Sequence, residues 1–158
     1  MAYERVYSVT DYWDGIRAGA ADYGGVPHIF RSVWRADDDD WDLGRYFLRP
    51  ISGEQAAWEA EWWAIWRRFA SFYRGRRALA AKVPGDWGAL PEDLDRHREL
   101  EKLLANVRST SQADCLVATG AFRAIEPSVR GFIAPLLEVE WSAAMTFPDD
   151  QLVPIPAI

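Results

Sequence analysis

The sequence predicts an α+β domain in which a mostly antiparallel sheet of about six strands packs on one long, tryptophan-rich helix and a second, shorter helix. The order of the local patterns is the first reason, because four strand-like segments precede two helical segments and two further strands follow. Composition is the second reason. The 158 residues are 49% hydrophobic and include nine tryptophans, which excludes a disordered chain. A chain of this length forms a core without disulfides, in keeping with its single cysteine, Cys115.

The N-terminal third is expected to form four strands. Residues 3–10 have the β-prone pattern of a first strand. Gly24-Gly25 then predicts a two-residue type I′ turn between strands at 16–23 and 26–35, because both turn positions require positive φ. This turn sets the register, with Tyr23 opposite Val26, Ala21 opposite His28, Gly19 opposite Phe30, and Arg17 opposite Ser32.

A fourth strand is predicted at 45–51, after an acidic loop at 37–42. Pro50, near the end of this strand, favours an edge or a terminal position, since proline cannot donate a ladder hydrogen bond.

Two helices are expected in the middle of the chain. Ser52-Gly53-Glu54-Gln55 has the form of a capping box and predicts a helix over 53–74, with Gly75 as its C′ residue. At 100° per residue its apolar stripe is Trp58, Trp62, Ile65, Trp66, Phe69, Phe72 and Tyr73. Trp63 falls off this stripe, and we expect it to be exposed or, alternatively, covered by the C-terminal tail. Pro91 predicts the start of a second helix that ends near Asn106.

The C-terminal part is expected to add two strands, at about 113–124 and 132–142. In the second of these, Leu137, Val139 and Trp141 alternate with polar residues and share one face. Residues 148–158 hold three prolines and no periodic pattern, so we expect an extended tail after a single domain at 1–147.

The net charge of −6 disfavours binding to nucleic acid or to anionic membranes, because both require clustered cations. No apolar stretch reaches the length of a membrane span, and the N-terminus does not have the layout of a secretory signal, so a cytoplasmic location is expected. One basic segment interrupts the acidic chain, and the placement of its cations near a helix C-terminus agrees with the helix dipole: Arg67, Arg68, Arg74, Arg76, Arg77 and Lys82.

Common catalytic, nucleotide and thiolate-zinc motifs do not occur in the sequence, so we expect no cofactor and no metal. Asp38, Asp40 and Asp42 have the alternation of a calcium loop, but Arg49 stands where an EF-hand requires glutamate. A solvated acidic loop is the preferred interpretation, with a weak calcium site as the alternative. Cys115 and His97 are interpreted as packed residues.

One set of residues is a candidate ligand site: Arg17, His28, Glu59, Glu61 and Trp62. Small residues at 18–21 leave room on the hairpin faces, to be filled by helix tryptophans or by a ligand. Glu59 and Glu61 have no cation four residues later on their helix, so they are available to Arg17, Arg31, Arg49 or His28. Converging polar groups beside aromatic walls are typical of a small-molecule pocket. The alternative is a structural salt bridge.

The preferred functional hypothesis is a non-enzymatic binding module, with a basic protein partner attracted by the acidic surface. Trp63 and Arg67 are its candidate interface residues, because tryptophan and arginine are frequent interface hot spots. The alternative is a small-molecule or catalytic pocket between the hairpin and the long helix. Nucleic-acid binding by residues 67–82 is a weaker third hypothesis. The sequence predicts no particular oligomeric state.

Overall fold

The structure of the protein is a computed structural model that describes residues 2–12, 14–75, 88–109, 115–125 and 136–143. Its strands are β1 (Glu4–Tyr12), β2 (Ile16–Tyr23), β3 (Val26–Arg35), β4 (Asp40–Pro50), β5 (Leu116–Ala124) and β6 (Leu137–Ala143). Its helices are α1 (Gly53–Gly75), the single 3-10 turn η2 (Pro91–Asp93) and α2 (Leu94–Arg108). The α+β class and the order of the elements agree with the sequence prediction. The predicted tail at 148–158 and most of the loop before Pro91 lie outside the described residues.

The six strands form a closed antiparallel barrel in the order β1-β2-β3-β4-β5-β6. Closure occurs where Glu4 and Arg5 of β1 pair with Val139 and Glu138 of β6. The sequence predicts the antiparallel sheet but not its closure into a barrel. Of the two positions predicted from Pro50, the structure shows the terminal one, because Pro50 is the last residue of β4, and β4 is no edge strand, because it pairs with both β3 and β5. Bulges in β1 and a register shift after Ser32 bend the strands enough to close the sheet. Closure also removes edges that would pair with other chains.

The β2–β3 hairpin has the predicted turn and register. Gly24 and Gly25 have φ values of 60° and 74°, the left-handed region that a type I′ turn needs. Tyr23 pairs with Val26, Ala21 with His28, and Gly19 with Phe30. The carboxylate of Glu4 accepts hydrogen bonds from both turn amides, each 2.8 Å long. The turn is thereby tied to the first strand of the barrel.

Aromatic side chains fill the barrel interior, and their rings meet edge to face or tilted. Phe30 and Tyr46 are 5.5 Å apart between ring centroids, and Tyr46 is 5.8 Å from Trp141. Two glycines make room for these rings. A Cβ on Gly120 would lie 2.5 Å from Trp141, and a Cβ on Gly19 would lie 2.8 Å from Phe30. The small residues on the strands thus leave the space that the large aromatic side chains occupy inside the barrel.

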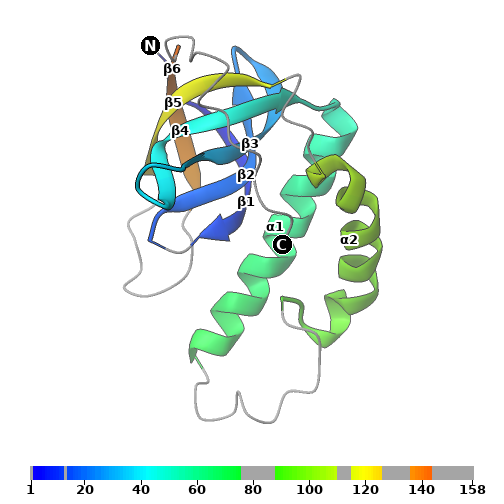
Figure 1. Cartoon of the computed structure of the whole chain (residues 1–158). Coiled ribbons are helices and arrows are strands. Elements are labelled where there is room, and N and C mark those ends of the chain that lie inside the picture. Colours follow the sequence, from blue (N-terminus) through cyan, green and yellow to red (C-terminus); the bar gives the residue numbers. More distant parts are fainter. Residues whose placement is uncertain (1, 13, 76–87, 110–114, 126–135, 144–158) are drawn as a thin grey trace.

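Both helices lie on one side of the barrel, with α1 crossing β1 and α2 running beside α1 (Figure 1). A second core joins the outer barrel surface to both helices: Val9, Ala20, Ile29, Ile51, Ala56, Trp62, Trp63, Ile65, Ala89, Leu100, Leu104 and Val107. The capping box of α1 is confirmed. Ser52 N donates to Gln55 Oε1 at 2.9 Å, and Gln55 N donates to Ser52 Oγ at 3.1 Å.

Trp63 is only 6% exposed, so the prediction of an exposed Trp63 is wrong. Its ring stacks between those of Trp62 and Trp66, at centroid distances of 6.3 and 5.5 Å. The prediction from the helical wheel took the helix to bury one stripe of residues against one sheet. Because α1 is packed against both the barrel and α2, a wider arc of its surface is buried.

Candidate functional site

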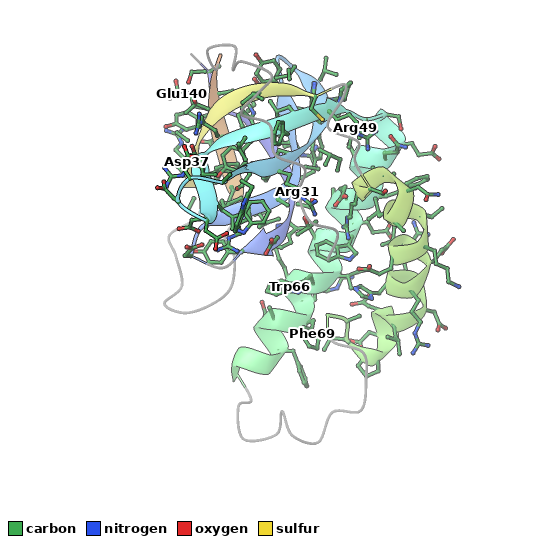
Figure 2. All side chains as sticks on the ribbon, in the orientation of Figure 1. Arg31, Asp37, Arg49, Trp66, Phe69 and Glu140 are labelled. Atoms are coloured by element: carbon green, nitrogen blue, oxygen red, sulfur yellow. The ribbon has the colours of Figure 1, made fainter. Side chains whose placement is uncertain are left out.

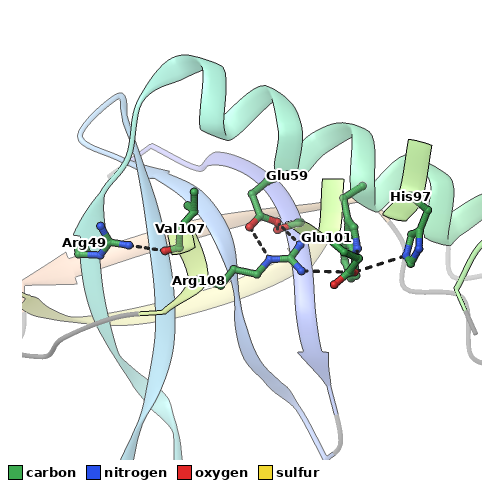
Figure 3. Close-up of polar contacts among 8 residues, drawn as sticks. Arg49, Glu59, His97, Glu101, Val107 and Arg108 are labelled. Atoms are coloured by element: carbon green, nitrogen blue, oxygen red, sulfur yellow. Dashed lines mark hydrogen bonds and ion pairs between the residues drawn. The ribbon is translucent and has the colours of Figure 1, made fainter. Parts of the chain in front are cut away.

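A buried ion pair lies where α1, α2 and the barrel meet (Figure 3). Glu59 of α1 has 0% exposure, and Arg108 at the end of α2 donates to both of its carboxylate oxygens, at 2.8 and 2.9 Å. Ser8 of β1 donates a third hydrogen bond to Glu59, at 2.7 Å. The Glu59 carboxylate therefore holds three elements together through charge-assisted hydrogen bonds.

The same arginine contacts an aromatic and acidic group on the two helices. The Arg108 guanidinium carbon lies 4.3 Å from the ring centroid of Trp62, whose indole N–H donates to Glu101. The His97 ring stacks on Trp62, with the two ring centroids 6.4 Å apart. His97 Nε2 lies 3.6 Å from the Glu101 carboxylate. Both carboxylate oxygens of the buried Glu59 have hydrogen-bond partners, as buried polar groups in folded proteins usually do, so these contacts suit a structural role.

Of the predicted ligand residues, the structure brings only Glu59 and Trp62 into this cluster. The cation that binds Glu59 is Arg108, which is not among the partners predicted from the sequence. Arg108 lies two residues beyond the predicted end of its helix and 49 residues from Glu59, so no local spacing connects the two. The contacts of Glu59 fit the structural salt bridge that the sequence left as an alternative.

Two other predicted ligand residues, His28 and Arg17, have partners outside this cluster. His28 is buried on the interior side of β3, with Nδ1 2.7 Å from the Val26 carbonyl oxygen and an edge contact to Tyr23. Arg17 donates to Asp14 at 2.8 Å. Arg17, His28 and Glu59 thus have separate partners, and the pocket that they would share stays a prediction. Because side chains alternate along a strand, His28 lies on the same face of β3 as Phe30, which packs inside the barrel, whereas Ile29 packs in the core that includes the helices.

Glu61 forms an ion pair between the two helices. Arg96 donates to both of its carboxylate oxygens at 2.7 Å, and this hydrogen-bonded guanidinium lowers the pKa of Glu61 below its usual value. Arg67, the other predicted interface residue, is half-buried, and its neighbour Arg68 binds Asp93 at 2.9 and 3.0 Å. The rest of the basic segment lies largely outside the described residues.

A second polar group, which we call the acidic rim, lies at the β3–β4 hairpin and the adjacent β1–β2 turn. It consists of Asp11, Tyr12, Asp14, Trp34, Asp37, Asp38, Asp39, Asp40 and Trp41. Asp39 occupies the tight hairpin turn with a φ of 51°, which aspartate tolerates better than most residues. Figure 2 shows Asp37 on the side of the barrel away from the helices.

Aromatic rings lie among these carboxylates. Trp34 and Trp41 are direct partners across the hairpin, with centroids 5.0 Å apart and nearly perpendicular rings. Arg17 connects the hairpin to the β1–β2 turn, because its guanidinium lies 5.8 Å from the Trp41 centroid while it binds Asp14. Tyr12 is 50% exposed, and both tryptophans are half-buried.

The base of the hairpin is fixed by Asp42. Its carboxylate accepts hydrogen bonds from the amide of Gly44, at 3.0 Å, and from the Arg45 guanidinium. Burial alone would raise the pKa of Asp42, but these hydrogen bonds lower it below the usual value. Asp42 therefore stays ionised and stabilises the irregular segment of β4 from which the rim projects.

Cations neutralise only part of the acidic rim. Asp14 pairs with Arg17, and Asp38 pairs with Arg35. Within the described part of the chain, no cation pairs with Asp11, Asp37, Asp39 or Asp40. These four exposed carboxylates give one end of the barrel a concentrated negative charge.

Among the described residues, no group of three or more histidine, cysteine, aspartate or glutamate side chains is arranged to hold a metal ion. The described helices include none with the length and apolar character needed to cross a bilayer. Comparison of the chain with known protein families, with curated proteins and with solved structures finds no match.

Proposed function

We propose that the protein is a non-enzymatic interaction module that binds a basic protein partner through the acidic rim. The observation that carries the proposal is the group of exposed carboxylates that pair with no cation among the described residues, Asp11, Asp37, Asp39 and Asp40, beside the Trp34–Trp41 pair. The predicted interface residues Trp63 and Arg67 have no part in it, because they belong to the helical side of the molecule.

The chemistry of the rim fits a cationic protein segment. Exposed carboxylates attract a basic partner over several ångströms and accelerate the encounter. Aromatic rings add contact area, and their faces attract guanidinium and ammonium groups. Arg17 illustrates this mode within the chain itself, because it binds a rim aspartate and lies over a rim tryptophan at the same time. A partner that presents several arginines or lysines would repeat these contacts.

The pocket hypothesis has less support, since its polar residues bind separate partners. The predicted cytoplasmic location and the exclusion of nucleic acid stay predictions. An acidic rim repels phosphate backbones and attracts basic proteins, so the proposal favours a protein partner over a nucleic acid.

A binding measurement with charge-matched variants tests the proposal. The probe is a short peptide of alternating arginine and glycine, titrated into the protein by calorimetry at low and at physiological salt. The D37N/D39N/D40N variant should bind this peptide at least about tenfold more weakly than the unchanged protein, because long-range attraction and direct pairing are both lost.

The matched control removes the same charge from the helical side. Glu54, Glu92 and Asp95 are exposed, and the E54Q/E92Q/D95N variant should keep the affinity of the unchanged protein. Equal weakening in both variants would mean that net charge alone attracts the peptide. That result, or no binding at low salt, would overturn the assignment of the rim.

A further inference from the structure

Two neighbouring arginines on the outer face of β3 and β4 have no carboxylate partner among the described residues, although acidic residues outnumber basic ones in the chain, 24 to 18. They are Arg31 of β3 and Arg49 of β4. Most other described arginines bind an aspartate or glutamate: Arg17, Arg35, Arg45, Arg68, Arg96, Arg108 and Arg123. Arg31 is exposed and makes no polar contact within the described part of the chain.

The strand register places these two arginines together. Ile29 pairs with Arg49, and Arg31 pairs with Phe47, so the arginines are diagonal neighbours on one face of the β3–β4 pair, with Cα atoms about 7–8 Å apart. Ile29 on that face belongs to the core beneath the helices. Figure 2 shows both arginines on the side of the barrel that faces α1 and α2.

Arg49 has a buried donor that lacks an acceptor. Its Nη2 donates to the carbonyl oxygen of Val107 in the last turn of α2, whereas its buried Nε–H has no hydrogen-bond partner. Other described side-chain atoms share this feature, among them Arg17 Nε, and a water, an ion or a ligand can supply the acceptor that such a donor lacks. The carboxylate in the same region, Glu59, is already bound by Arg108 and Ser8 (Figure 3).

We infer that Arg31 and Arg49 form an anion site, at the junction of the barrel with the end of α2, that takes the phosphate group of a small molecule. Guanidinium groups bind oxyanions through paired N–H donors. A carboxylate presents two coplanar oxygens, which one guanidinium satisfies. A phosphate presents oxygens in several directions and carries up to two charges, so it suits two arginines that approach from neighbouring strands.

Titration with inorganic phosphate, followed by NMR of the arginine Nε–H groups, tests this inference. The Arg49 Nε–H signal should move with saturable dependence on phosphate, because it gains an acceptor. Arg31→Gln should weaken the phosphate affinity about tenfold, as expected for the loss of one charge-assisted contact. Arg49→Lys keeps the charge but loses the Nε–H donor, and it should weaken binding as well.

Arg5→Gln is the matched control, because Arg5 is an exposed arginine of β1 that lies over Tyr7 and has no carboxylate partner in the described part of the chain. This variant should bind phosphate as the unchanged protein does. Acetate at the same ionic strength should bind more weakly than phosphate, which distinguishes the two oxyanion classes. No saturable shift at Arg49, or equal affinity in the Arg31→Gln variant, would overturn the site.

Discussion

Glu59 and Arg108 are the residues whose removal should most disturb the junction between helices and barrel. Glu59 is fully buried, whereas the Arg108 side chain keeps 22% of its surface exposed. Removing Arg108 leaves a buried carboxylate without its counter-charge, so Arg108→Met should lower the free energy of unfolding by about 3–5 kcal/mol. Glu59→Gln should cost less, because Arg108 can turn its guanidinium toward water. Urea unfolding followed by circular dichroism measures both.

The double variant distinguishes a coupled pair from two independent contacts. E59M/R108M removes both charges and replaces them with side chains that pack well, so it should be more stable than the sum of the two single effects implies. Additive losses in this cycle would contradict the account of Glu59 and Arg108 as one unit.

Tyr46 gives a pH dependence that is specific to the barrel interior. Burial raises the pKa of Tyr46 to about 12, and its hydroxyl donates to the Ile16 carbonyl oxygen at 2.8 Å. The pKa of an unfolded tyrosine is near 10, so the folded state holds this proton more tightly. The difference of about two pKa units corresponds to about 3 kcal/mol in the free energy of unfolding. This contribution is fully present below pH ~10 and is lost as the pH rises toward ~12.

Ultraviolet absorbance titration measures this ionisation, and the difference between the unchanged protein and Tyr46→Phe isolates it from the other five tyrosines. A Tyr46 component that ionises near pH 10 while the protein stays folded would be evidence that the hydroxyl is accessible to water.

At the scale of the elements, the tight fit of strands in the barrel depends on Gly19 of β2. A Cβ at this position would lie 2.1 Å from the backbone oxygen of Ser8, so the β1–β2 pair must move to accept any side chain. Gly19→Ala should destabilise the protein by about 2 kcal/mol or more, as overpacking of a rigid core does. Thermal unfolding measures the effect.

Gly53→Ala is the control for this substitution. Gly53 is the first residue of α1, and a Cβ there would have nothing within 4 Å, so the stability should change by no more than about 0.5 kcal/mol. Equal effects at the two glycines would contradict the packing that the structure assigns to Gly19.

Elements with local signals could be predicted from the sequence, and elements defined by distant partners could not. The Gly24-Gly25 turn and the Ser52–Gln55 capping box each depend on residues within four positions of one another. The position of β4 depends on pairing with β5, about 70 residues later, which no local pattern encodes. The burial of Trp63 likewise depends on α2, so the apolar pattern within α1 alone does not predict it.

At the scale of the whole molecule, the protein has two sides with different character. The helical side holds its charges in reciprocal pairs, such as Glu59–Arg108 and Glu61–Arg96, and buries its tryptophans. The acidic rim includes carboxylates that pair with no cation of the described chain, and Figure 2 shows one of them, Asp37, on the side of the barrel away from the helices. The acidic loop at 37–42 was identifiable from composition, but its nearness to Trp34, Trp41 and Arg17 required the fold. The described tryptophans therefore fall into two groups: Trp34 and Trp41 belong to the acidic rim, whereas those of the long helix and Trp141 inside the barrel are mainly architectural.

This division makes the tryptophan indole signals the most direct test of the proposed function. In an NMR titration with the arginine–glycine peptide, the indole N–H signals of Trp34 and Trp41 should shift progressively with peptide. The signals of Trp62 and Trp63, buried between the helices and the barrel, should stay where they are. Shifts at the helix tryptophans without shifts at Trp34 and Trp41 would contradict binding at the acidic rim.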